Sequence, residues 1–272
     1  MTFESDGVRM DLRPVASLLP HEEIIPEQLE KIVGQIRRDG VQKDPVIVDR
    51  DSGAVLDGMH RLAAFGKLNL ENVVCCLVDY SSPGIELRRW ARVYKTTRKD
   101  LFDRALEELG VAESVSLSVA FDSLDSRKVG LAVLSRDGCR VSGKQDGLGD
   151  AFRTVKRLDE VGRTLGWQRS FVREDEVDFA LEDGGNVLLV KRLTKQDVLN
   201  AARTRSLFPC KTSMHTIDPR PVALDFPIKD INTATPKTIA ELLKKRSPRL
   251  WPAGSEYEGR RYKERLLVLH QH

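Results

Sequence analysis

Apolar positions in the N-terminal part of the chain form short strand-like runs around one clear helical repeat. Apolar residues recur at helical spacing over positions 29–36, with Pro26 at a first-turn position and Gly40 just beyond, which predicts a helix over 26–38. The other elements expected here are an extended entry at 15–19, a hairpin at 45–48 and 54–56, a helix at 60–67 and a buried strand at 72–78. This order predicts a compact α/β unit.

The middle of the chain has a different pattern, with longer helical repeats between isolated strands. We expect helices at 101–109, 150–165 and 195–203, and strands near 115–121, 130–134, 170–172 and 187–192. Polar residues are scattered in this region and form no tight cluster. It is therefore predicted to be an accessory α+β domain.

A chain of 272 residues is long for one compact core, because domains commonly run to roughly 100–200 residues. We predict an α/β (α+β) fold with two lobes. The expected parts are an N-terminal domain over 1–98, a second, smaller α+β domain over 99–205, a distal segment over 206–235 that returns to the first lobe, and a basic C-terminal tail over 236–272.

Charge is distributed unevenly along the chain. The formal net charge is +3, of which the tail contributes +5, so that residues 1–235 carry −2. A protein that binds nucleic acid is expected to carry a basic stripe on its folded body, because phosphate contacts supply most of the non-specific affinity. The charge distribution therefore argues against nucleic acid as a partner.

The spacing of the cysteines and the length of the apolar runs indicate the cellular compartment in which the protein is expected. The four cysteines show no CxxC pairing and no histidine at zinc-finger spacing, which argues against a metal site or a disulfide framework. No apolar run approaches the roughly 18–20 residues of a membrane helix, and the acidic start lacks the plan of a signal peptide. We expect a cytoplasmic protein with reduced cysteines and no membrane partner.

A candidate phosphate-binding turn lies at Asp57-Gly58-Met59-His60-Arg61, between a predicted strand and a predicted helix. A glycine in this position lets backbone N–H groups approach an anion, and the helix N-terminus adds partial positive charge. His60 and Arg61 add donors, and the guanidinium fork suits phosphate oxygens. An ordinary turn capped by Asp57 would have the same sequence, so the motif is not decisive alone.

Two other loops carry groups that suit phosphate chemistry. Glu22, just before the first predicted helix, could take the proton of an attacking hydroxyl, or could instead cap the helix. The Pro-marked loop 208–216 carries the donors Lys211, Thr212, Ser213 and His215, which would bind a polyphosphate or simply face solvent. Trp90 is compatible with a core position or with a ligand contact.

Together these segments resemble the ParB/sulfiredoxin superfamily and, within it, the free serine kinases. The resemblance is carried by residues 20–22, 44–48, 56–64 and 78–80, and by 209–215, which is similar to the kinases' Pro-Lys-Thr-Thr-Arg-His segment. It implies that the N-terminal domain is a ParB/sulfiredoxin-like catalytic domain that phosphorylates L-serine, or a related small hydroxy amino acid, to its O-phospho form. The implied donor is ADP or ATP, with Mg²⁺ as the cofactor.

The resemblance also implies a role for each candidate residue. Glu22 would be the general base, Trp90 would shape the serine pocket, and Val41 and Lys43 would line the nucleotide side. The phosphate-binding residues would be Asp57, Gly58, Met59, His60 and Arg61 in the turn, and Lys211, Thr212, Ser213 and His215 in the distal loop. No protein ligand to the metal is assigned, because Mg²⁺ would be held through the nucleotide phosphates.

The sequence departs from the kinase pattern in the turn and in the distal loop. Met59 stands where the kinases have a histidine, which removes one side-chain donor and leaves the backbone N–H. Cys210 is an insertion, and Ser213 and Met214 stand where threonine and arginine are expected. These changes leave the choice between ADP and ATP open.

Two other functions use a turn of this kind. A ParB-type nucleotide-dependent DNA-binding protein would use the turn for a nucleotide and the basic tail for DNA, but no helix-turn-helix pattern follows Arg61. A sulfiredoxin-like reductase needs a thiolate in the turn, and the thioether of Met59 cannot serve as that nucleophile. We therefore expect a serine kinase, with the ParB-type protein as the alternative.

Overall fold

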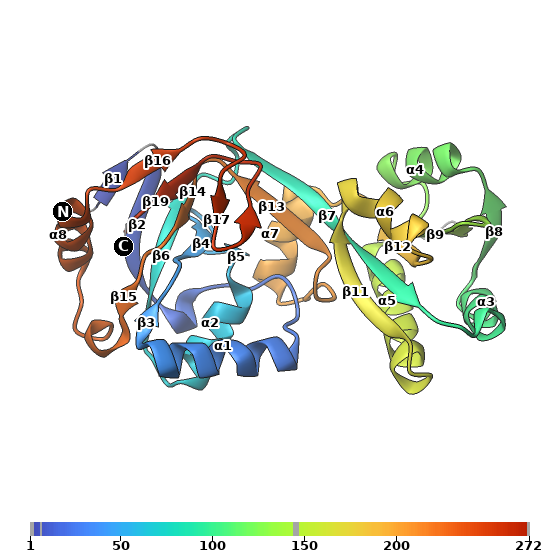
Figure 1. Ribbon diagram of the computed structural model, residues 1–272, viewed down its shortest axis with the longest axis horizontal. Helices are drawn as coiled ribbons and strands as arrows, with labels where there is room; N and C mark the ends of the chain where they lie inside the picture. Colours follow the sequence, from blue (N-terminus) through green and yellow to red (C-terminus); the bar gives the residue numbers. More distant parts are fainter. Residues whose placement is uncertain (1–2, 6, 144–146, 271–272) are drawn as a thin grey trace. The chain divides into compact units, whose positions relative to one another are not determined.

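The computed structural model describes residues 3–5, 7–143 and 147–270, and it divides into two compact units (Figure 1). Unit 1 comprises Met1–Glu86, Lys195–Cys210 and His215–His272. Unit 2 comprises Leu87–Thr194 and Lys211–Met214. The chain thus passes from unit 1 to unit 2 twice and returns each time.

A mixed sheet forms the centre of unit 1. Its strands, in spatial order, are β1 (Phe3–Ser5), β2 (Val8–Pro14), β6 (Asn72–Val78), β4 (Val46–Asp49) and β5 (Val55–Asp57). β6 is parallel to β4 and antiparallel to β2, and residues 73–78 of this strand are all buried. A continuous apolar strand is typical of such a central position.

Helices α1 (Pro26–Asp39) and α2 (Met59–Lys67) pack against each other in unit 1. Pro26 begins α1, where its fixed φ suits the first turn, and Gly40 ends it in the left-handed conformation with φ 67°. The Gly40 N–H donates to the carbonyl of Ile36 at 2.9 Å. The start of α2, directly after β5, positions the phosphate-turn motif.

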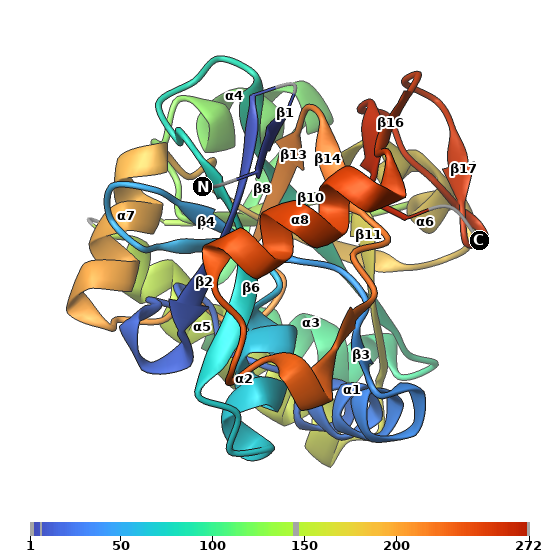
Figure 2. The same ribbon diagram turned by 90° about the vertical axis from the view of Figure 1, so that its left-hand side faces the viewer.

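The last part of the chain is folded into unit 1. Helix α8 (Pro236–Arg246) buries Ile239, Ala240 and Leu243 and packs on β1 and β2 (Figure 2). The remaining elements assigned to this unit are η1 (Val15–Ser17), β3 (Val41–Gln42), α7 (Lys195–Thr204), β14 (Arg220–Val222), β15 (Phe226–Pro227), η3 (Ile228–Asp230), β16 (Arg249–Trp251), β17 (Glu256–Tyr257), β18 (Arg260–Arg261) and β19 (Leu266–Val268). β19 lies between β14 and β16 in a small sheet, and β3 pairs with β15.

Unit 2 is built on a second sheet with the strand order β11-β7-β12-β9-β10-β8. Its strands are β7 (Ile85–Lys95), β8 (Val111–Val115), β9 (Leu131–Ser135), β10 (Gly138–Ser142), β11 (Gln168–Arg173) and β12 (Asn186–Val190). The part of β7 that belongs to unit 2 begins at Leu87. Its helical elements are α3 (Lys99–Glu108), α4 (Leu117–Asp125), α5 (Leu148–Thr164), η2 (Glu174–Glu176) and α6 (Val177–Glu182). One apolar cluster joins β7, β9, β10 and β12 to α4 and α6. β13 (Ser213–Ile217) runs from unit 2 back into unit 1.

The expected mixed α/β architecture is confirmed, with two local corrections. The strand expected at 115–121 is wrong, because β8 ends at Val115 and α4 follows at once. Ser116 caps this helix by accepting a hydrogen bond from the Val119 N–H at 3.4 Å. The extended entry at 15–19 contains the short 3₁₀ turn η1.

The boundaries of the units also differ from the sequence expectation. The first boundary was expected at residue 98, after β7, whereas the structure divides between Glu86 and Leu87 because most of β7 pairs with β11 and β12. Residues 236–270, expected as a tail, form α8 and strands of unit 1.

Candidate active site

Glu22 lies on an extended segment that backbone hydrogen bonds hold in place. The Phe208 N–H donates to the carbonyl of His21, and the Glu23 N–H donates to the carbonyl of Phe208, both at 2.9 Å. Glu22 itself is only 5% exposed. The N-cap of α1 is Ile25, so Glu22 does not stand at the capping position. The structure therefore joins the candidate base to the first residue of the distal loop.

A buried polar cluster lies beside this segment. His21 donates from Nδ1 to the carbonyl of Val55 at 2.8 Å, and its ring meets that of His215 edge-on, with centroids 5.6 Å apart. His215 accepts from the hydroxyl of Tyr80 at 2.8 Å and also hydrogen-bonds the backbone of Leu56. Burial lowers the pKa of His21 and holds that of His215 well below its usual value, so both rings are neutral.

His215 was expected to bind phosphate, and the structure engages both of its ring nitrogens with protein groups. In this arrangement the ring anchors the end of the distal loop to β5 and to Tyr80. The distal loop thus returns to unit 1 at His215, whose ring lies beside that of His21. His21 is the residue directly before Glu22 in the sequence.

The turn Asp57–Arg61 has the conformation that its glycine allows. Gly58 is the N-cap of α2 with φ 95°, in the left-handed region that favours glycine. The first helical hydrogen bond runs from the Leu62 N–H to the Gly58 carbonyl at 2.8 Å, so the N–H groups of residues 59–61 lie at the open end of the helix. This is the geometry of a helix-terminal anion site.

Arg61 folds back over the turn. Its Nη2 donates to Asp57 Oδ2 at 3.1 Å, and its Nη1 lies 3.5 Å from Asp44 Oδ2. A Cβ atom added at Gly58 would lie 2.8 Å from Arg61 Nη2, so the guanidinium occupies the space that the glycine leaves. The buried Nε of Arg61 has no hydrogen-bond partner among the described residues.

His60 connects the turn to the segment that carries Glu22. Its Nε2 accepts a hydrogen bond from the Ile25 N–H at 2.8 Å, which places the proton of the neutral ring on Nδ1. The side chain of Met59 is half-buried. The candidate base and the candidate phosphate turn are therefore parts of one hydrogen-bonded framework.

Two further residues that sequence reasoning missed support the turn. Arg220 of β14 donates from Nη1 to Asp57 Oδ2 at 3.0 Å and from Nη2 to the carbonyl of His215 at 2.7 Å. Its Nε donates to Glu264 at 2.6 Å, and both side chains of this pair are 9% exposed. Arg220 thereby links the turn, the end of the distal loop and the C-terminal segment. Glu264 lies 44 residues further along the chain, and no sequence spacing indicates this pair.

A cavity of about 210 Å³ in unit 1 is lined by Val41, Lys43 and Arg61, three of the residues predicted to bind the nucleotide. Ile36 and Phe65 add apolar surface, and the remaining lining residues are Ile32, Gln35, Asp39, Gln42 and Asp44. The ammonium group of Lys43 pairs with Glu258 at 2.6 Å, and this hydrogen bond raises the pKa of Lys43. Lys43 is therefore a cation at neutral pH.

The other distal-loop residues and Trp90 lie in unit 2. Lys211 Nζ is 4.6 Å from the centroid of the Trp90 ring, a cation–π contact. The backbone N–H of Trp90 donates to the carbonyl of Thr212 at 3.4 Å. The guanidinium of Arg92 donates from Nη1 to the carbonyl of Lys211, also at 3.4 Å. Thr212 and Ser213 are buried. Within unit 2, Trp90 therefore lies next to Lys211 and Thr212 of the distal loop.

Two of the cysteines, Cys75 and Cys76, lie buried in β6. Burial raises the pKa of the Cys76 thiol to about 12, and it raises that of Cys75 further, so both stay protonated. Within residues 3–5, 7–143 and 147–270, no group of three or more His, Cys, Asp or Glu side chains is placed to hold a metal ion. No helix among these residues is both long and apolar enough to cross a membrane.

Known structures with the same fold include kinases. A free serine kinase in complex with AMP superposes with a TM-score of 0.69 at 19% identity, over 84% of this chain and 96% of the other. SbnI from Staphylococcus aureus superposes with a TM-score of 0.68 at 16% identity, over 87% of this chain and 94% of the other. The chain therefore has the fold that these two proteins share.

Comparison of the sequence with curated proteins finds L-serine kinases. The chain is 29% identical to the ATP-dependent L-serine kinase of Desulfurococcus mucosus, over 75% of its own length and 83% of that protein. It is 21% identical to the ADP-dependent L-serine kinase SerK of Thermococcus kodakarensis, over 78% and 88% of the two chains. No family model matches the chain. The chain is a homologue of the L-serine kinases, related to them along three quarters of its sequence.

The ParB-type alternative has narrower support. A ParB-like protein of Sulfolobus acidocaldarius is 36% identical, but over only 28% of this chain and 38% of that protein. The basic segment that would have contacted DNA is folded as α8 and strands of unit 1. The comparisons therefore favour the kinase over the DNA-binding protein.

Proposed function

We propose that the chain is an L-serine kinase that transfers a phosphoryl group from ATP or ADP to the hydroxyl of free L-serine, giving O-phospho-L-serine. The proposal is carried by the hydrogen-bonded framework of unit 1, which holds Glu22, the Asp57–Arg61 turn and both ends of the distal loop together. A nucleotide co-substrate fits a cytoplasmic enzyme.

Glu22 is the proposed general base. A carboxylate can accept the proton of the serine hydroxyl as its oxygen attacks the terminal phosphorus of the nucleotide. The bond from that phosphorus to the bridging oxygen breaks, and the nucleotide leaves with the electron pair as ADP or AMP. Backbone hydrogen bonds on both sides of Glu22 fix its position, which is the main requirement for catalysis of phosphoryl transfer.

The nucleotide is proposed to bind in the cavity of unit 1, with its phosphates at the turn. A volume of about 210 Å³ is smaller than the roughly 300–1,000 Å³ of pockets that enclose a whole ligand, so the cavity would hold one part of the nucleotide. Val41 and Lys43 line it. Arg61, whose Nε lacks a partner among the described residues, and the N–H groups of residues 59–61 would contact phosphate oxygens.

The remaining candidate residues have proposed supporting roles. Lys211, Thr212 and Ser213 would add donors for phosphate oxygens, and Trp90 would shape the serine pocket. His215 would hold the loop end in place through its bonds to Tyr80 and Leu56. Asp57, held by two arginines, would fix the orientation of the turn rather than contact phosphate directly.

Magnesium is proposed to enter with the nucleotide. The carboxylates nearest the turn, Asp44 and Asp57, both face Arg61, and the described residues offer no three-ligand cluster. Mg²⁺ commonly keeps several waters and binds through substrate phosphates, with one or two carboxylates. When bound, it would neutralise charge on the phosphates and supply no protein-bound nucleophile.

The function is tested by incubating the purified protein with L-serine, Mg²⁺ and either ATP or ADP, and identifying the products by mass spectrometry. We expect one O-phospho-L-serine for each nucleotide consumed, with ADP as the second product from ATP and AMP as the second product from ADP. L-threonine and L-homoserine serve as acceptor controls. Nucleotide hydrolysis without a phosphorylated amino acid, or no turnover with either nucleotide, would refute the proposal.

Gly58→Ala tests the turn. The change forces a side chain into the left-handed region and against the Arg61 guanidinium, so nucleotide affinity should fall about tenfold and stability by about 1–2 kcal/mol. Isothermal titration with ATP and ADP measures the first effect, and urea unfolding measures the second. Gly66→Ala is the matched control and should retain full affinity, because Gly66 lies in the same helix without a left-handed φ, and an added Cβ would make only an ordinary contact with Val15 at 4.0 Å. Equal affinity of the Gly58 and Gly66 variants would remove the turn from the nucleotide site.

A further inference from the structure

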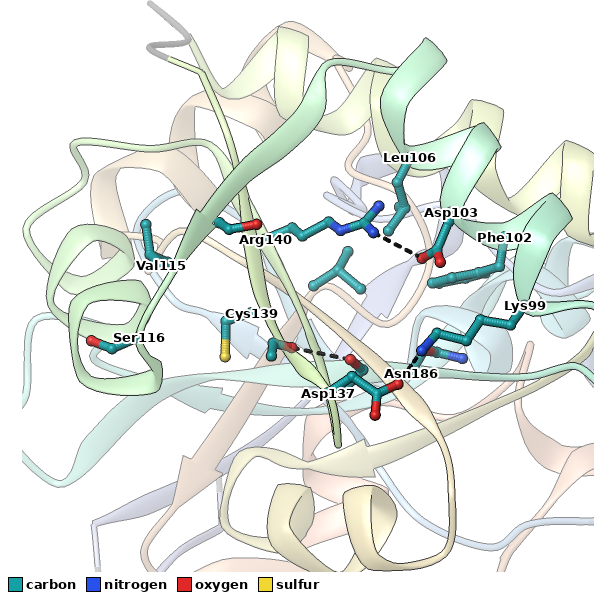
Figure 3. A pocket seen from close by; sticks show the side chains of 14 residues that line it. Lys99, Phe102, Asp103, Leu106, Val115, Ser116, Asp137, Cys139, Arg140 and Asn186 are labelled. Atoms are coloured by element: carbon teal, nitrogen blue, oxygen red, sulfur yellow. Dashed lines mark hydrogen bonds and ion pairs between the residues drawn. The ribbon is translucent and has the colours of Figure 1, made fainter.

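A second cavity lies wholly within unit 2 and contains none of the candidate active-site residues (Figure 3). Its volume is about 440 Å³, inside the roughly 300–1,000 Å³ range of small-molecule sites. Helix α3 forms one wall with Lys99, Phe102, Asp103 and Leu106, and β10 contributes Cys139 and Arg140. The remaining lining residues are Ser114, Val115, Ser116, Val133, Ser135, Asp137, Gly138 and Asn186.

Two ion pairs line this cavity. Arg140 Nη2 lies 3.2 Å from Asp103 Oδ1, and both side chains are about one-third exposed. Lys99 pairs with Asp137 nearer to solvent, where both side chains are about two-thirds exposed. The four charges sum to zero. Such exposed or half-exposed pairs contribute little stability, so a ligand can replace either partner at low cost.

Arg140 carries an unused donor. Its Nη1 is buried and makes no hydrogen bond with any of the described residues. A buried donor without a partner costs free energy, and a carboxylate that reached it would gain a charge-assisted hydrogen bond. Asp103, on the facing helix, would accept a bond from an ammonium group of the same ligand. A polyphosphate does not fit, because Asp103 and Asp137 would repel it.

We propose that this cavity binds a free α-amino acid with a short, uncharged polar side chain. The ligand carboxylate binds Arg140 Nη1, and its ammonium group binds Asp103. The side chain of the ligand has polar partners among the lining residues Ser114, Ser116 and Asn186, and Phe102 and Leu106 add apolar surface. The site is distinct from the proposed active site of unit 1, and its existence does not depend on the proposed kinase activity.

The proposal is tested by calorimetric titration of the intact protein with L-serine, L-threonine, L-asparagine and L-glutamine. To separate this site from the active site, the titrations are compared with those of cavity variants, because an active-site variant such as Glu22→Gln keeps the proposed serine pocket. We expect at least one of these amino acids to bind the unchanged protein. Two derivatives of that amino acid should not bind. The α-carboxamide lacks the α-carboxylate, and the N-acetyl form lacks the ammonium group.

Variants of the cavity complete the test. Arg140→Gln and Asp103→Asn should each weaken binding about ten- to a hundredfold, since each removes one charge-assisted contact. Asp103→Asn keeps its shape and is partly exposed, so it remains informative if Arg140→Gln unfolds. Arg104→Gln is the matched control, because Arg104 lies on the same helix and pairs with Glu108, and neither lines the cavity. The proposal is overturned if none of the four amino acids binds, or if the two cavity variants bind as tightly as Arg104→Gln.

Discussion

Glu22→Gln should lower kcat for serine phosphorylation by about a hundred- to ten-thousandfold, the usual contribution of a general base. Glutamine preserves the size of the side chain and the backbone bonds to Phe208, but it cannot accept the hydroxyl proton. Nucleotide affinity should therefore stay within about twofold of the original. The rate is measured as phosphoserine formed under saturating substrates, and the affinity by isothermal titration.

Glu23→Gln is the control for this experiment. Glu23 is the sequence neighbour of Glu22, is less buried, and shares the same backbone pairing with Phe208. It should keep most of its activity. Full turnover by Glu22→Gln would exclude Glu22 as the base, whereas equal losses in both variants would indicate damage to the segment rather than to the chemistry.

Arg220→Met should lower the free energy of unfolding by about 3–5 kcal/mol, because it leaves the buried carboxylate of Glu264 without its cation. Activity should fall as well, since Asp57 and the carbonyl of His215 lose a donor. Urea denaturation gives the stability, and the serine kinase assay gives the activity.

A double variant separates these two effects. Arg220→Met/Glu264→Leu replaces the buried pair with apolar side chains of similar size, a change that is often neutral for stability. It should recover most of the lost stability but not the nucleotide affinity, because Asp57 has then lost one of the two arginines that hold it at the turn. If the double variant recovers affinity and turnover too, Arg220 serves stability only.

Elements marked by local signals were predictable from the sequence. Pro26 and Gly40 delimit α1, and the apolar run 72–78 is β6. The prediction of a strand at 115–121 was wrong, because the spacing of the apolar residues there is compatible with a strand or with a helix. Ser116 favours the helix, because its side chain caps the first turn. Signals of this kind act within a few residues, which is why boundaries and short elements were the less reliable part.

The candidate site shows the same limit on a larger scale. Glu22 and the Asp57–Arg61 turn belong to contiguous motifs, so their residue types and order were readable. Arg220 and Glu264 could not be found in this way, because they meet only when β14 and β19 pair side by side. The folding of residues 236–270 onto unit 1 was hidden by their charge, since the apolar face of α8 is confined to a few positions between lysines.

The position of Glu264 in the sequence has a consequence for biosynthesis. Asp57 precedes Arg220 by 163 residues, and Arg220 precedes Glu264 by another 44. A ribosome therefore releases the whole turn motif long before it has made the residues that brace it. During that interval a nascent chain carries the phosphate-binding sequence without Arg220 and Glu264, so the support of the turn is complete only after β14 and β19 have been made and have paired.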